Sequence, residues 1–138
     1  AADEARIGEG GGPLGPEVFG DLRSFTPSGF LIEAIDRFLS ETPARIEVLQ
    51  EASGRGDADS FSRRAHSLRG SAAILGALRL MKLAAQLEDR GLAEPHDVAA
   101  LLQAVQLEFE TVRTALLRER ESALRASAAP PGPDDRPA

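Results

Sequence analysis

His66 is the residue of this sequence best suited to chemistry, because of the residues one helical turn to either side. Arg63 and Arg69 place positive charge near the imidazole ring, and Gly70 adds no side chain beside it. An imidazole with a free nitrogen is a nucleophile near neutral pH, and guanidinium groups bind phosphate oxygens. A glycine inside a helix lowers the stability of the helix by about 1 kcal/mol relative to alanine. Its presence is explained if the missing side chain lets another protein approach closely. This combination predicts a site that accepts a phosphoryl group.

The segment that carries His66 has the apolar repeat of a helix over residues 57–75, with Asp57 as its cap and Gly76 as its end. Placed at about 100° per residue, five apolar residues share a buried stripe: Phe61, Ala65, Leu68, Ala72 and Leu75. His66 lies about 140° from the centre of that stripe, so we predict an exposed imidazole. The same polar sector holds the residues that we expect to meet a partner: Ser62, Arg63 and Ala73.

Helical repeats also occupy the segments before His66. A short amphipathic helix is predicted from Pro16 to residue 25, with its apolar side chains at Val18, Phe19, Leu22 and Phe25. Ser28 can cap the next helix, whose apolar stripe continues through Pro43. Proline removes one backbone donor, so this stretch is either one kinked helix or two abutting helices. The run of residues 53–57 breaks the pattern.

Two helices are predicted after the His66 segment. The first covers residues 78–90 and ends at Gly91. The second begins at Pro95 and carries a long apolar stripe: Val98, Leu101, Leu102, Val105, Phe109, Val112 and Leu116. Four such helices with short connections predict an all-α, antiparallel up-and-down four-helix bundle, with the short N-terminal helix as a lid across one end.

The composition limits what kinds of partner the chain can have. Its 138 residues suffice for one domain, which we place at 16–125, between a Gly-rich linker at 1–15 and a Pro-rich tail at 126–138 that are both expected to be disordered. A net charge of -6 and the lack of Trp and Tyr argue against nucleic-acid binding. No cysteine, secretory signal or apolar run long enough for a membrane is present, so we expect a cytoplasmic monomer.

The segment 65–72 is followed by Leu75-Gly76-Ala77, Leu80, Leu87 and Glu88. This pattern closely resembles the histidine-containing phosphotransfer (HPt) domains of bacterial phosphorelays. The resemblance covers about residues 16–120. It implies that His66 is phosphorylated by the aspartate of a response-regulator receiver domain and passes the group to another receiver. The family usually has Lys at Arg69, so the charge is kept, although the two side chains present their donors differently.

The resemblance also assigns a role to Glu88, because the family often places a carboxylate or amide there, in contact with the active imidazole. Glu88 flanks the apolar stripe of the 78–90 helix, from which it could reach the inner ring nitrogen and leave the outer one nucleophilic. The alternative is a surface salt bridge with Lys82 or Arg90.

We therefore expect a phosphocarrier with no ATP site and no catalytic activity of its own, which requires no cofactor except Mg²⁺ held by the partner receiver. The expected partners are receiver domains, with a histidine kinase as a further candidate. Two alternatives stay open: a helical adaptor that regulates receivers by binding alone, and the phosphoacceptor domain of a chemotaxis-type histidine kinase.

Overall fold

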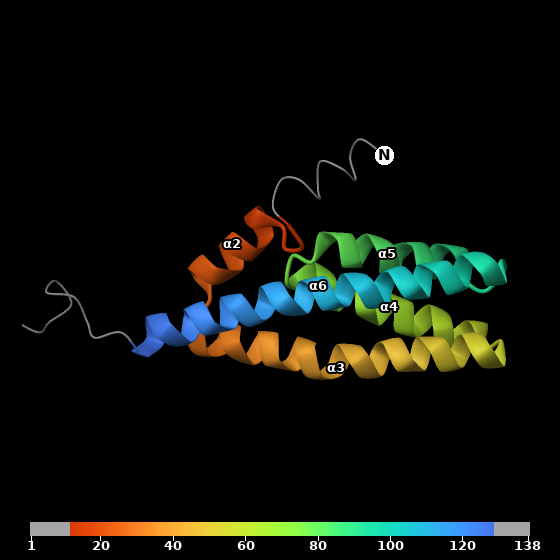
Figure 1. Ribbon diagram of the computed structural model, residues 1–138, viewed down its shortest axis with the longest axis horizontal. Helices are drawn as coiled ribbons and strands as arrows, with labels where there is room; N and C mark the ends of the chain where they lie inside the picture. Colours follow the sequence, from red (N-terminus) through yellow and green to blue (C-terminus); the bar gives the residue numbers. More distant parts are fainter. Residues whose placement is uncertain (1–11, 129–138) are drawn as a thin grey trace, which may run out of the picture.

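The computed structural model describes residues 12–128, and every regular element in that range is an α-helix. The helices are α2 (Pro16–Phe25), α3 (Ser28–Arg55), α4 (Ala58–Ile74), α5 (Leu78–Arg90) and α6 (Pro95–Ala128). α3 packs against α4 and α6, and α5 packs against the same two helices, so the four long helices form a ring. Consecutive helices run in opposite directions (Figure 1), which confirms the antiparallel four-helix bundle with an additional short N-terminal helix.

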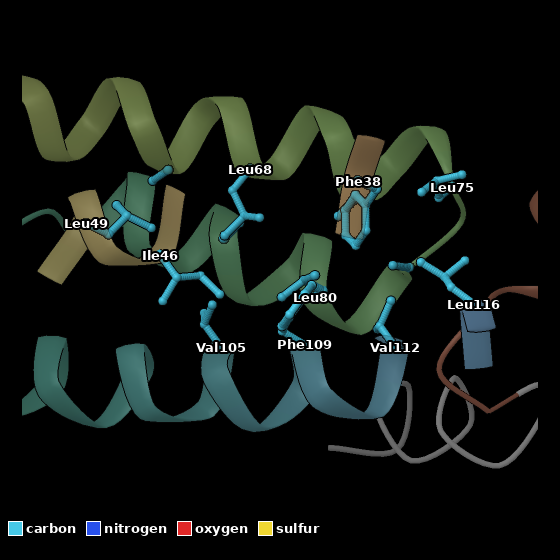
Figure 2. Packing of buried hydrophobic residues seen from close by; sticks show 14 of the residues in the cluster. Phe38, Ile46, Leu49, Leu68, Leu75, Leu80, Val105, Phe109, Val112 and Leu116 are labelled. Carbon is cyan, nitrogen blue, oxygen red and sulfur yellow. The ribbon is translucent and has the colours of Figure 1, made fainter. Parts of the chain in front are cut away.

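The core lies along the axis of this ring and is almost entirely aliphatic. The stripe predicted for α4 is buried in full, and the stripe of α6 is buried except for Leu101, which is only partly covered. Figure 2 shows these side chains meeting residues of α3 and α5 between the helices. Phe38 and Phe109 supply the aromatic contact, with ring centroids 6.1 Å apart. The apolar periodicity therefore determines which face of each helix points inward.

α3 is one continuous helix through Pro43, which answers the question that the sequence left open. Proline removes a single backbone hydrogen bond, whereas buried side chains on both sides of it, including Phe38 and Ile46, hold the helix against the bundle. The predicted break at 53–57 was too wide. The helix continues to Arg55, and the turn is made by Gly56 in the left-handed conformation at φ 68°.

The predicted caps at the start of α3 and α4 had different outcomes. Asp57 caps α4 as expected, because its carboxylate accepts a hydrogen bond from the backbone N–H of Ser60 at 3.1 Å. Ser28 does not cap α3. Pro27 occupies the capping position without a side-chain hydrogen bond, and Ser28 is the first helical residue.

α2 lies over the end of the bundle where α3 and α6 extend beyond α4 and α5 (Figure 1). Gly15 donates a backbone hydrogen bond of 2.6 Å to the carbonyl of Gly76, in the turn that follows α4. A Cβ on Gly76 would lie 3.1 Å from Cβ of Val18, so this close approach favours glycine. The predicted apolar face of α2 is only partly correct, because Phe19 is buried whereas Phe25 is 84% exposed.

The predicted disordered ends, 1–15 and 126–138, fall mostly outside the described residues. Where they overlap with the structure, both boundaries move outward. Leu14 is buried in the core cluster, ahead of the expected domain start at 16. At the other end α6 continues to Ala128, three residues past the expected boundary at 125. Farther back on α6, Arg120 donates hydrogen bonds of 2.6 and 3.3 Å to the carboxylate of Asp36 on α3.

Candidate functional site

His66 lies in the middle of α4, on the side of the helix that faces away from the core. Its neighbours Ala65 and Leu68 are fully buried, whereas 73% of the imidazole side chain is exposed. The prediction of an exposed imidazole is therefore confirmed. The buried neighbours hold the backbone of this turn, so the position of the ring is fixed although its outer edge is open.

The inner nitrogen of the ring is held by a residue of the neighbouring helix. Nδ1 of His66 lies 3.1 Å from Oε1 and 3.2 Å from Oε2 of Glu88 on α5. An ionised carboxylate can only accept, so Nδ1–H is the donor and Nε2 carries the lone pair in the neutral ring. Within residues 12–128 no hydrogen bond engages Nε2. The arrangement leaves the outer nitrogen available as a nucleophile.

Glu88 also contacts the arginine on the next turn of α4. Nη1 of Arg69 lies 3.6 Å from Oε2 of Glu88, whose side chain is 22% exposed. One carboxylate therefore neutralises Arg69 and orients His66. Of the two surface partners considered for Glu88, Arg90 instead pairs with Asp97 at 3.9 Å, and no ion pair of Lys82 is formed within the described chain.

The other predicted site residues surround His66 on α4. A Cβ built on Gly70 meets no side chain or other helix of the described part of the chain within 4 Å, so this position is open. Arg63 is exposed and pairs with Asp59 at 3.3 Å, and Ser62 and Ala73 are half-buried. α4 therefore brings together on one face all the proposed residues except Glu88, which reaches this face from α5.

Sequence reasoning missed two features next to this face. Arg45 of α3 donates a hydrogen bond of 2.6 Å to Oγ of Ser71 and pairs with Glu41 at 3.1 Å. Ile74 at the end of α4 is 67% exposed. The helical repeat contained a signal for Ile74, because it lies about 80° from His66 and far from the buried stripe. For Arg45 the sequence had no signal, since its partner is on another helix.

A second carboxylate–arginine pair, in which the carboxylate is buried, lies between α5 and α6. Oε1 of Glu108 is 3.6 Å from Nη1 of Arg79, and Glu108 is only 8% exposed. Burial raises the pKa of the Glu108 carboxyl, and the nearby Arg79 partly opposes this effect. Among the described residues, Oε2 of Glu108 and Nε of Arg79 have no hydrogen-bond partner. This pair is not in contact with His66 and was not predicted.

Other kinds of site find no support in the described part of the chain. Residues 12–128 contain no group of three His, Cys, Asp or Glu side chains placed to hold a metal ion. His96 is exposed at the start of α6. None of the described helices has the length and apolar character needed to cross a membrane.

The comparison with known families agrees with this geometry. A family model described as the Hpt domain matches residues 33–127, which is more than half of the chain and includes α4, α5 and nearly all of α6. No curated protein and no solved structure matched the chain. Members of the matched family are phosphocarriers that transfer phosphoryl groups through a histidine, and they interact with response-regulator receiver domains. From residue 33 to residue 127 this chain belongs to the Hpt domain family.

Proposed function

We propose that this domain accepts a phosphoryl group on His66 from the aspartate of one receiver domain and passes it to another. The observation that carries the proposal is the exposed imidazole whose Nδ1 is bound by Glu88, on the central helix of a chain that belongs to the Hpt family. Such a ring presents one nitrogen in one tautomer at a fixed place. That is what a nucleophile for an incoming phosphoryl group requires.

The transfer step follows from this tautomer. The lone pair of Nε2 attacks phosphorus in line with the aspartyl oxygen, so an N–P bond forms as the O–P bond breaks. The receiver's aspartate leaves as a carboxylate. No proton leaves the ring, because Nδ1–H stays bound to Glu88 while the phosphorylated imidazole gains positive charge. The Glu88 carboxylate stabilises that charge, and the reverse step returns the group to a second receiver.

The arginines and Gly70 serve the approach of the phosphoryl group. Arg69 is 47% exposed and can offer its remaining N–H groups to the phosphoryl oxygens while it contacts Glu88. Arg63 adds positive charge one turn earlier. The open space at Gly70 admits the partner's surface. The Mg²⁺ that phosphoryl transfer commonly requires is supplied by the receiver in this proposal.

The test is a transfer assay with the full chain. Receiver domains from the same genome are phosphorylated with acetyl phosphate and Mg²⁺, freed of the donor, and mixed one at a time with this protein. Label is expected on the chain, and it should be labile in acid and stable in base, as a phosphoramidate is and a phosphoserine is not. ATP and Mg²⁺ alone should give no label.

The same assay separates the alternatives. An adaptor that acts by binding alone would bind receivers and remain unlabelled by all of them. The phosphoacceptor domain of a chemotaxis-type kinase would be labelled by the ATP-binding domain of such a kinase and not by receivers. Label that appears with ATP alone would contradict the carrier proposal.

A further inference from the structure

A groove runs between α3 and α4 on the side of His66 that faces α3. It has a volume of about 300 Å³, and its lining combines charged residues of α3 with apolar residues of both helices. Two large apolar side chains at its edge are open to solvent, Phe30 at 63% and Ile74 at 67% exposed. An exposed apolar pair at the rim of a groove is unusual for a surface that meets only water.

The charged groups of the groove favour an apolar occupant. Arg45 is engaged by Glu41 at 3.1 Å and by Ser71 at 2.6 Å, so these groups satisfy one another. An apolar side chain that covers these groups therefore leaves none of their charges buried without a partner. Glu33 and Arg37 line the same groove and can form a polar rim around such a contact.

The groove lies within reach of any domain that reacts with His66. Ile74 is eight residues beyond His66 on α4, which is about 12 Å along the helix axis. A transient partner that buries about 600 Å² of this surface covers a patch with a radius on the order of 14 Å. Gly70, between the two residues, has no side chain to obstruct that coverage. A partner centred on His66 therefore reaches Ile74 at the edge of the groove.

The opposite flank of His66 offers no comparable contact. None of the residues of α5 is an exposed large hydrophobic, and the part nearest His66 carries Glu88 and the exposed Asp89. Of these two flanks, as far as residues 12–128 show, the α3 side is therefore the one that carries exposed large apolar side chains for the core of an interface. Phe30 also precedes the residues matched by the Hpt family model, 33–127, so this edge of the groove lies outside the part of the chain matched to the family.

We infer that the groove between α3 and α4 receives an apolar side chain of the partner receiver, and that Phe30 and Ile74 thereby select among receivers. The inference rests on the proposed phosphotransfer function and adds the docking contact to it. Phe30 and Ile74 touch the partner and take no part in the reaction at His66.

The experiment compares two phosphoryl donors on the full chain. One donor is the receiver that transfers fastest to the parent protein, and the other is potassium phosphoramidate, which is too small to need docking. Phe30→Ser and Ile74→Ser should each lower the second-order rate of transfer from the receiver by roughly tenfold or more, the usual loss at an important interface residue. Labelling by phosphoramidate should stay within about twofold of the parent, since His66 is untouched.

Leu107→Ser is the matched control, because Leu107 is 65% exposed on α6 and does not line the groove. Both of its rates should equal those of the parent, and thermal melts should show that all three variants fold. Parental receiver transfer in Phe30→Ser and Ile74→Ser would overturn the inference. So would an equal loss with both donors, since the substitutions would then act on His66 itself.

A further measurement uses the receivers that transfer more slowly, and it tests whether Phe30 contributes to the choice of receiver. Phe30→Ser should reduce the ratio between the fastest receiver and the others, whereas an equal fall for every receiver would overturn the selective role. If phosphoramidate labels the parent protein but no receiver does, the proposed function fails, and the docking inference fails with it. If receivers label the parent and the variants alike, only the docking inference fails.

Discussion

Two carboxylate–arginine pairs in this molecule have the same separation and opposite consequences. Glu88 and Arg69 are 3.6 Å apart beside His66, and Glu108 and Arg79 are 3.6 Å apart between α5 and α6. Both oxygens of Glu88 have partners, and its side chain is 22% exposed. Glu108 is more deeply buried, with one oxygen unpartnered. Distance alone therefore does not distinguish the two pairs. Solvent access does, and so does His66, which contacts Glu88 and has no counterpart beside Glu108 among the described residues.

The difference between the two pairs is tested most strongly at His66, because only the Glu88–Arg69 pair lies beside an exposed imidazole. His66→Gln should abolish labelling by phosphorylated receivers and by phosphoramidate. Its thermal melt should be close to that of the parent, since substitutions at exposed positions usually change stability by no more than about 0.5 kcal/mol. Acid-labile label that persists on this variant would remove His66 from the mechanism.

Gly70 gives the next largest effect, and it separates function from stability. Gly70→Gln should slow transfer from a receiver by at least roughly tenfold, equivalent to about 1.4 kcal/mol, because the new side chain blocks the approach to His66. The fold should tolerate it, since nothing lies within 4 Å of the added Cβ.

Gly70→Ala is the control for the glycine substitution. It should raise the free energy of unfolding by up to about 1 kcal/mol on helix propensity. If Gly70→Gln melts normally and transfers at the parental rate, the partner does not approach across this position.

Substituting Glu88 tests whether its contact with His66 contributes to transfer. Glu88→Ala removes the acceptor of Nδ1–H, and transfer should slow by about two- to tenfold, the worth of one net hydrogen bond of about 0.5–1.5 kcal/mol. Glu88→Gln keeps an oxygen that can accept from Nδ1–H but loses the charge that stabilises the positive ring, so it should recover only part of the rate. A purely electrostatic role would instead leave Gln as slow as Ala, which transfer rates for both variants would show.

The last effect, at Glu108, concerns stability alone. Because burial raises its pKa in the folded state, the stability that this carboxyl contributes is fully present below its unfolded pKa of about 4.5. That contribution is lost as the pH rises through the folded pKa. Relative to Glu108→Gln, the parent should therefore become less stable between about pH 4.5 and pH 7, by about 1.4 kcal/mol for each unit that separates the two pKa values.

Urea unfolding at these two pH values measures the difference, with Glu110→Gln on the exposed side of α6 as the control. The control should show no such change, and transfer rates at His66 should be unaffected in both variants. A difference between parent and Glu108→Gln that does not vary with pH would contradict the raised pKa.

Most of the fold follows from local information in the sequence. Apolar side chains that recur every three or four residues determine the inward faces of α4 and α6, and Asp57, Gly76 and Gly91 mark helix ends because their effects are confined to a single turn. His66 could be placed on the exposed side of α4 for the same reason. Its neighbours Arg69 and Gly70 lie on the same helix, so one periodicity relates all three.

The contacts that complete the site cross between helices, and no periodicity encodes them. Whether Glu88 meets His66 or a surface cation depends on how α4 and α5 are rotated against each other, which the whole core decides. The same is true of Arg45 with Ser71, of the buried Glu108, and of the groove that Phe30 and Ile74 border. Continuity through Pro43 was also decided by packing, because the one hydrogen bond that proline removes counts for less than the side chains buried on either side of it. The sequence by itself therefore determined the helices and the exposed position of His66, whereas only the tertiary structure determined which side chains hold its ring and which surround it.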